Sequence, residues 1–134
     1  MTNAIFRKID CHMLSAPNLD AAIGFYEGRL GQKLLWKSDV AAGFAMPDTD
    51  AELVVHTRLG PETDLKVESV ADAFERLIAA GASCIASPFD IAIGRCAVVR
   101  DPFGNVLTIL DQSKGPLKVD AARNVIRESE AGRP

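Results

Sequence analysis

The sequence predicts an α+β fold made of two similar modules, each with the order strand, helix and three strands. A turn that leads into an apolar strand occurs at residues 101–111 and again, less clearly, at residues 46–56. Each copy lies downstream of an amphipathic helix that ends in glycine, at Gly31 and at Gly81. Triplets of short strands indicate antiparallel hairpins, and two helices are too few for a doubly wound parallel sheet. A repeat of about 50 residues indicates two related halves, and we expect the functional site in the cleft between them.

Composition limits the size of the core and the class of partner. The chain has 134 residues, of which 48% are hydrophobic. That is enough for one domain with a core and too little for two ordinary domains. The net charge is −3, and no run of Lys and Arg exceeds two residues. We therefore expect neither nucleic acid nor a membrane surface as a partner.

The first residues and the cysteines indicate a cytoplasmic protein. No apolar signal-peptide stretch follows Met1, and no segment has the roughly 18 consecutive apolar residues of a membrane-spanning helix. Cys11, Cys84 and Cys96 are odd in number and match no Cys-x-x-Cys pattern. We expect three reduced thiols, most of them buried.

The first module is expected at about residues 7–59. Alternating residues around 9–15 predict a strand, and Pro17 and Asn18 end it. A helix follows from Leu19 to Leu30, with Asn18 as its N-cap and Gly31 as its stop. Its apolar stripe is Leu19, Ala22, Ile23, Tyr26 and Leu30. Three strands are predicted next, at residues 33–37, 41–46 and 52–57.

The second module is expected at about residues 62–115 and repeats this order. The predicted elements are a strand at 65–68, a helix at 70–80, and strands at 84–86, 96–100 and 106–111. The helix should bury Val70, Ala73, Phe74, Leu77 and Ile78. The second module is longer than the first by a loop at 87–95, and such loops often border binding sites. Residues 1–115 then form a single domain, and residues 116–134 form a charged tail with a short helix from Val119 to Ser129 and a frayed end.

The turn at 101–105 carries a family resemblance. Two such modules, with Asp-Pro-x-Gly-Asn before the last strand, resemble the vicinal oxygen chelate superfamily of glyoxalase I, bleomycin-resistance proteins and extradiol dioxygenases. The Ile9-Asp10 opening and the Phe25-Tyr26 pair of the first helix add to the resemblance, which covers about residues 7–115. It implies a curved, mostly antiparallel open sheet whose concave face holds a small molecule, usually with a divalent metal. It also implies a homodimer, because related single-domain proteins usually pair.

The resemblance also implies four positions for metal ligands. Metal-using relatives take one ligand from the first strand and one from the last strand of each module, commonly His and Glu. The matching positions here are Cys11, Glu62, Val54 and Thr108. Valine cannot bind a metal and a neutral threonine hydroxyl is a poor ligand, so we expect no metal cofactor at this site. A divalent metal held by the non-standard set Cys11, His56 and Glu62 is the alternative.

The ligand cavity is expected on the face that carries these positions. Alternation along the strands predicts that Cys11, Met13, Val54, His56, Thr108 and Leu110 line it, with Arg95 at its rim. Arg95 is either a surface residue or a fork for an anionic or carbonyl-bearing ligand. His12 should point to the opposite face and pack under the helix with a hydrogen-bond partner. Trp36 either belongs to the core or forms a wall of the cleft.

Two function classes remain open. The first is a glyoxalase-like or bleomycin-resistance-like protein that binds a small organic molecule in the cleft between its modules without the usual metal. The alternative is a metal-dependent lyase, isomerase or dioxygenase of the same superfamily that uses non-standard ligands. The turn at 101–105 is expected to be structural in either case, because Pro102 fixes its φ and Gly104 permits a positive φ.

The sequence predicts a dimer that sedimentation can test. One domain of this kind forms only part of a closed surface, and the apolar strands together with the tail after Gly115 offer surface for pairing. We expect analytical ultracentrifugation at micromolar concentration to show a species of twice the 14.4 kDa chain mass. A species near 14.4 kDa alone would contradict the expectation.

Overall fold

The computed structural model describes residues 4–126 and divides the chain into two compact units. The N-terminal unit comprises residues 10–63 together with 118–126, and the C-terminal unit comprises residues 4–9 together with 64–117. The units therefore follow the two predicted modules closely. Two short segments belong to the unit of the other module. Residues 4–9 belong to the unit of the second module, and residues 118–126 of the tail belong to that of the first.

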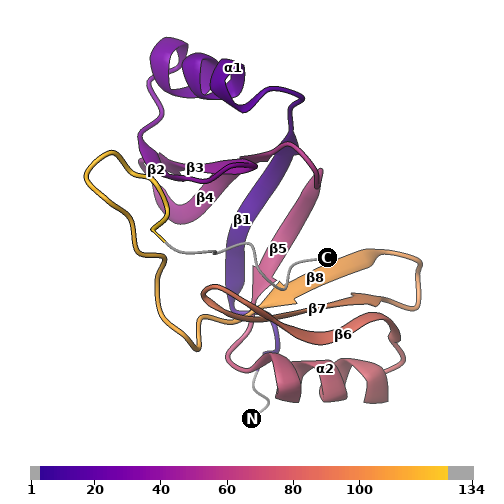
Figure 1. The fold of residues 1–134 in the computed structure, drawn as a ribbon. Helices are drawn as coiled ribbons and strands as arrows, with labels where there is room; N and C mark the ends of the chain where they lie inside the picture. Colours follow the sequence, from indigo (N-terminus) through magenta and orange to yellow (C-terminus); the bar gives the residue numbers. More distant parts are fainter. Residues whose placement is uncertain (1–3, 127–134) are drawn as a thin grey trace. The chain divides into compact units, whose positions relative to one another are not determined.

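The N-terminal unit contains the first copy of the predicted element order (Figure 1). Its elements are β1 (Lys8–Ser15), α1 (Leu19–Ile23), η1 (Gly24–Arg29), β2 (Leu34–Lys37), β3 (Ala41–Met46) and β4 (Thr49–His56), and the first two residues of β1 lie in the other unit. The strand order is β2-β3-β4-β1, in which β1 runs parallel to β4 and the other neighbours are antiparallel.

The C-terminal unit repeats this arrangement. Its elements are β5 (Glu62–Lys66), of which Glu62 and Thr63 lie in the other unit, α2 (Val70–Ala79), β6 (Ser83–Ile91), β7 (Gly94–Arg100) and β8 (Val106–Leu110). The strand order is β6-β7-β8-β5, with β5 parallel to β8 and antiparallel pairing elsewhere. The α+β class and the two βαβββ modules are thereby confirmed.

Strand register confirms the internal repeat residue by residue. Met13 lies opposite Val54 between β1 and β4, and Asp64 lies opposite Thr108 between β5 and β8. The two pairs are related by the offsets that the sequence predicts, 51 on the first strand of each module and 54 on the last. Cys11 therefore corresponds to Glu62, and Val54 to Thr108.

Each helix begins at a side-chain cap, Asn18 as predicted and Ser69 in the second module, and covers one face of its own sheet. The Asn18 side chain accepts the Ala21 amide at 2.8 Å, and the Ser69 hydroxyl accepts the Asp72 amide at 3.3 Å. In the N-terminal unit, Ala22 of α1 packs on Phe44 and Val55. The predicted first helix is divided, because its second half from Gly24 to Arg29 is a π-helix.

Strand alternation leaves the other face of each sheet without a helix, and we call it the helix-free face. In the N-terminal unit it carries a separate apolar cluster of Cys11, Met13, Val40, Ala41 and Val54. In the C-terminal unit, Val99 and Ile109 pack with Leu77 of α2, whereas Cys96 and Leu110 form a separate cluster with Ile91. The register predicted from the sequence is therefore correct, since a slip of one residue would exchange the two sets.

Three sequence expectations are wrong in detail. Ile78 of α2, expected to be buried, is 38% exposed. Residues 87–95 do not form a free loop, because β6 extends to Ile91 and pairs with β7 as a hairpin that turns at residues 92–93. The described part of the tail, residues 116–126, contains no helix. Asn124 instead forms a bridge with Lys37, whose amide donates to Arg123 O at 2.9 Å, and the Val125 amide donates to Lys37 O at 2.8 Å. The remaining residues of the predicted helix, 127–129, lie outside the described part of the chain.

The turn at 101–105 is structural, as expected, and the tail contains a second copy of it. Asp101 Oδ1 accepts the amides of Phe103 and Asn105 at 2.9 and 2.8 Å. Asp120 Oδ1 accepts the amides of Ala122 and Asn124 at 2.9 Å each. In each turn the asparagine side chain donates to the second carboxylate oxygen of the aspartate. Arg123 takes the place of Gly104 and has a positive φ of 71°.

Asp111, directly after β8, joins three segments of the C-terminal unit. Oδ2 accepts the amide of Val70, the first residue of α2, at 2.9 Å, and Oδ1 accepts the amide of Arg95 in β7 at 3.0 Å. Oδ1 also accepts the amide and hydroxyl of Ser113 at 3.2 and 2.8 Å. A Cβ at Gly94 would collide with this carboxylate, so the approach requires glycine there.

The charged form of Asp111 is favoured in the fold. Burial by itself would raise its pKa, but the hydrogen bonds from Val70, Ser113 and Arg95 outweigh burial, and the pKa lies below its usual range. The positive end of the α2 dipole favours the carboxylate as well.

None of the helices in residues 4–126 is both long enough and apolar enough to cross a membrane.

Replacing Asp111 should destabilise the fold. Asp111→Ala leaves the buried Val70 amide and the Arg95 amide without their acceptor, and should lower the free energy of unfolding by about 2–4 kcal/mol. Asp111→Asn keeps one acceptor oxygen and should lose about half of that. Urea denaturation at pH 7 measures both, with the exposed Asp48→Ala as control, which should change stability by less than about 0.5 kcal/mol.

Acid should remove the same contribution. Because the folded-state pKa of Asp111 is lowered, its contribution is complete above about pH 4 and declines as the pH falls through the folded-state pKa. Between pH 7 and pH 3, Asp111→Asn should therefore lose less stability than the unchanged protein. An equal loss in both proteins would contradict this assignment.

Candidate functional site

The predicted lining residues of the N-terminal unit lie on its helix-free face. Cys11, Met13 and Val54 belong to the apolar cluster there, and Trp36 and Leu59 pack against them. All three are about 5% exposed, so the sheet face itself is closed by side chains. Their orientation agrees with the prediction, and their contact with a ligand stays a prediction.

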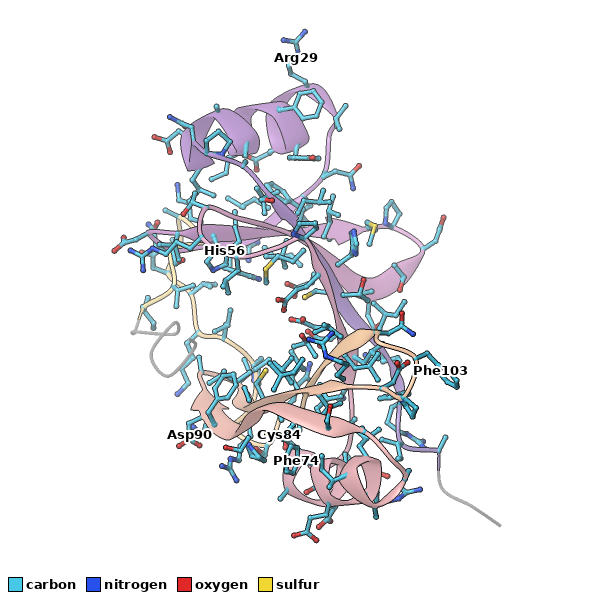
Figure 2. All side chains as sticks on the ribbon, turned by 90° about the vertical axis from the view of Figure 1, so that its right-hand side faces the viewer. Arg29, His56, Phe74, Cys84, Asp90 and Phe103 are labelled. Carbon is cyan, nitrogen blue, oxygen red and sulfur yellow. The ribbon has the colours of Figure 1, made fainter. Side chains whose placement is uncertain are left out.

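The predicted residues of the C-terminal unit are divided between a buried pair and an accessible arginine. Thr108 and Leu110 are buried. The guanidinium of Arg95 donates to Pro88 O at 3.1 Å and lies 3.7 Å from Asp90, within its own hairpin. The Asp90 carboxylate is also 3.3 Å from the Lys114 ammonium group. Asp90 is labelled in Figure 2. Arg95 is therefore partly occupied in holding the β6–β7 hairpin.

His56 at the end of β4 has a structural task (Figure 2). Its Nδ1 accepts the backbone amides of Arg58 and Leu59 at 3.0 and 3.1 Å. A ring nitrogen that accepts hydrogen bonds carries no proton, so the imidazole is the neutral Nε2–H tautomer. The side chain is buried and fixes the turn that follows β4.

The expectation for His12 needs a correction, whereas the expectation that most of the cysteines are buried is confirmed. His12 has the expected hydrogen-bond partner, since its Nδ1 lies 2.9 Å from the Thr63 hydroxyl, but the residue is exposed and does not pack under a helix. Cys11 and Cys96 are buried, whereas Cys84 on β6 is exposed. None of the three forms a disulfide.

The donor atoms do not fit the family's metal site. Val54 offers no donor, and Cys11 is packed among apolar side chains. Nδ1 of His56 is already used by two backbone amides. Among residues 4–126 no three His, Cys, Asp or Glu side chains are grouped closely enough to hold a metal ion.

Sequence reasoning missed Glu52, an ionisable side chain on the same face as the predicted site residues. Glu52 lies opposite Cys11 in the β1–β4 register and two residues before Val54, so it shares the helix-free face. The indole nitrogen of Trp36 donates to its Oε1 at 2.8 Å. Both side chains are half-buried. The signal in the sequence was strand alternation, which places residues 52, 54 and 56 on one face.

Gly43 makes this pairing possible. It lies opposite Trp36 on β2 and opposite Val54 on β4. Gly43 is therefore on the strand that separates Trp36 from the strand of Glu52. A Cβ at Gly43 would collide with the indole of Trp36 and would also lie 2.8 Å from the Glu52 carboxylate. The absence of a side chain lets the indole cross β3 and reach Glu52.

The environment of Glu52 disfavours its charge. Burial raises the pKa of Glu52, the hydrogen bond from Trp36 lowers it in part, and the nearby carboxylate of Asp10 raises it further. The net shift is upward. A half-buried carboxyl group with a raised pKa is a frequent property of binding and catalytic residues.

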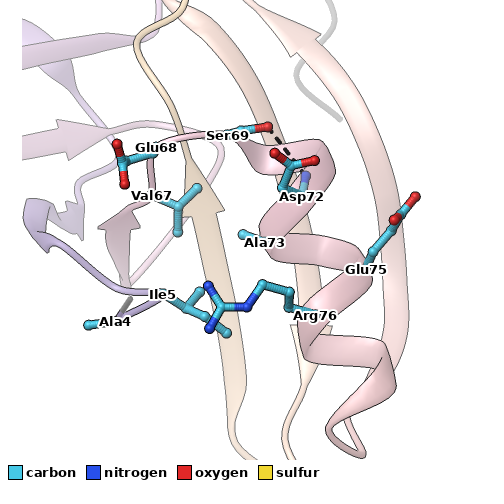
Figure 3. A pocket seen from close by; sticks show the side chains of 9 residues that line it. All are labelled: Ala4, Ile5, Val67, Glu68, Ser69, Asp72, Ala73, Glu75 and Arg76. Carbon is cyan, nitrogen blue, oxygen red and sulfur yellow. Dashed lines mark hydrogen bonds between the residues drawn. The ribbon is translucent and has the colours of Figure 1, made fainter. Parts of the chain in front are cut away.

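A separate hollow of about 430 Å³ lies at the start of α2 in the C-terminal unit (Figure 3). Val67, Ala73 and Ile5 supply its apolar part. Glu68, Asp72, Glu75 and Arg76 supply its charged part. None of the site residues predicted from the sequence lines this hollow.

Comparison with known families decides the membership of the chain. Residues 8–109 match the glyoxalase/bleomycin resistance protein/dioxygenase superfamily. The chain belongs to this superfamily. The resemblance seen in the sequence is thereby confirmed. No curated protein sequence matches the chain.

Solved structures from the same superfamily share the fold. Methylmalonyl-CoA epimerase from Mycobacterium tuberculosis is 16% identical, with a TM-score of 0.72 over 84% of this chain and 93% of that one. The Mn(II)-bound glyoxalase from Novosphingobium aromaticivorans is 19% identical, with a TM-score of 0.59 over 89% of this chain and 43% of that one. A homoprotocatechuate 2,3-dioxygenase variant from B. fuscum is 17% identical, with a TM-score of 0.57 over 81% and 33%. At these identities the similarity concerns the fold alone.

His56 should prove structural in a pair of substitutions. His56→Ala removes the acceptor of two amides and should lower the free energy of unfolding by about 2–3 kcal/mol. His56→Asn should lose about half as much, because its side-chain oxygen can accept the same amides in an Asx turn.

Urea denaturation of both variants tests the role of His56, with the exposed His12→Ala as control, which we expect to cost less than about 1 kcal/mol. If His56→Ala were as stable as the unchanged protein, the imidazole would be available for another role.

Proposed function

We propose that the protein binds a small organic molecule on the helix-free face of its N-terminal unit and does so without the superfamily's usual metal. Membership of the superfamily supports a small-molecule ligand, because epimerases, glyoxalases and dioxygenases of this fold act on small molecules. The observation that carries the proposal is the chemistry of the face itself.

That face is mostly apolar, with the Trp36–Glu52 pair as its accessible polar feature and a buried His56 that binds the turn after β4. Cys11, Met13 and Val54 form its floor, and the half-buried Trp36 and Glu52 lie at its accessible part. Apolar surface with a few placed polar groups is the usual composition of a small-molecule site. The floor lacks the nitrogen and oxygen donors that a catalytic divalent metal needs, which supports binding without metal.

Nuclear magnetic resonance can test the proposal with benzyl alcohol as probe. Trp36 is the only tryptophan, so its indole N–H gives a single resonance. Millimolar benzyl alcohol should shift this resonance saturably, together with the Val54 amide, and EDTA should leave the shift unchanged. Elemental analysis of the freshly purified protein should find far less than one divalent metal ion per chain.

The amide of Phe103 serves as the internal control. Phe103 is 86% exposed on the β7–β8 turn of the other unit, and its resonance should stay in place (Figure 2). One tightly bound Zn²⁺, Ni²⁺ or Fe²⁺ per chain, coordinated by Cys11, His56 or Glu62, would overturn the proposal in favour of a metal-dependent lyase, isomerase or dioxygenase. The absence of a saturable shift would also overturn it.

A further inference from the structure

The pairing of Trp36 with Glu52 narrows the chemical class of the ligand. The indole donates its single N–H to Oε1 of Glu52, and this bond fixes the carboxyl group at the accessible part of the helix-free face. Oε1 is thus engaged by Trp36, whereas Oε2 is the oxygen that remains for another donor. This inference rests on the function proposed above.

The charged group that acts on Glu52 is a second carboxylate, that of Asp10. In residues 4–126 its hydrogen-bond partner is Trp36, and it forms no ion pair. The neighbouring strand β3 carries no ionisable residue. Strand β1 carries Lys8, Asp10, Cys11 and His12, and β2 carries Lys37. Of these groups, Asp10 is the one whose charge raises the pKa of Glu52. A half-buried carboxylate beside a second carboxylate is costly, and a cation brought by a ligand would remove that cost.

The indole supplies the second half of a cation site. Positive groups are attracted to the face of a tryptophan ring, and protonated nitrogens prefer a carboxylate oxygen. Both groups are held in place here, because Gly43 leaves room for the ring and the ring holds the carboxyl group. Fixed recognition groups need not lose conformational freedom when a ligand binds.

We propose that Trp36 and Glu52 anchor an organic cation, a small molecule that carries a protonated amine next to a flat apolar group. The amine donates to Oε2 of Glu52, and the apolar group lies against the exposed part of the indole. The raised pKa of Glu52 agrees with this assignment, since a bound cation would favour the charged carboxylate.

Three benzyl compounds of nearly equal size test the charge preference. Benzylammonium, benzyl alcohol and benzoate are titrated into the ¹⁵N-labelled protein, and the Trp36 indole resonance reports binding. We expect benzylammonium to bind at least about tenfold more tightly than benzyl alcohol, since a charge-assisted hydrogen bond replaces a neutral one. Benzoate should bind most weakly.

Two variants and a matched control locate the preference. Glu52→Gln keeps the shape and the acceptor for Trp36 but removes the charge, so the two probes should bind with equal affinity. Glu27→Gln removes an exposed carboxylate of the same unit and should keep the preference. Gly43→Ala should displace the indole and weaken both probes, while the other amide resonances confirm that the variant is folded.

The outcomes separate this inference from the function on which it rests. A preference for benzylammonium that Glu52→Gln abolishes supports the cation site. Equal binding of benzylammonium and benzyl alcohol overturns the cation site and leaves the proposed function in place. If none of the three probes shifts the indole resonance, both are overturned.

Discussion

The carboxylate of Asp111 is the interaction on which the C-terminal unit most depends. Strand β7 is paired with β6 and β8, whereas helix α2 is joined to the sheet by apolar packing, which sets no direction. The hydrogen bonds from the Val70 and Arg95 amides do set one, because they fix the start of the helix and the start of the strand on the same side chain. Gly94 must lack a side chain for this geometry to exist.

The N-terminal unit also depends on a glycine that leaves room for a side-chain contact. There too a glycine, Gly43, lets side chains meet across a strand, and the meeting joins Trp36 to Glu52. Both cases place a polar group at the border of an apolar cluster. In the C-terminal unit the charged form is stabilised by amides, whereas in the N-terminal unit one indole only partly offsets burial. The first arrangement therefore suits a structural role and the second suits a ligand.

Much of the fold could be predicted from local chemistry. Asn18 and Ser69 are residue types that favour helix starts, and alternation defined the two faces of the strands. The repeat offset of 51 residues that relates Met13 to Asp64 is the one found in the observed strand register. What failed depended on strand pairing that no local signal marks, once between distant segments and once within a hairpin. Nothing near Val119 indicates that the tail pairs with Lys37, and the loop at 87–95 became a hairpin only because β7 lies beside it.

The sequence predicted the face of the candidate site but not the contacts that depend on strand pairing. The face that carries Cys11 and Val54 followed from alternation, but Glu52 does not occupy any of the four positions that hold metal ligands in relatives. Its contact with Trp36 depends on the registers of β2 with β3 and of β3 with β4. Those registers cannot be read from the residues alone. The structural task of His56 was equally hidden, because its partners are backbone amides.

The bridge between the tail and β2 has a consequence for how chains can associate. Strand β2 is at the end of its sheet order, and an edge strand normally offers free amides and carbonyls to another strand. At Lys37 both backbone groups are already bonded to Arg123 and Val125 of the same chain. A second molecule that tried to extend the sheet there would have to displace this segment first. The tail thus occupies the backbone hydrogen-bonding groups of Lys37 that a strand of a second molecule would need.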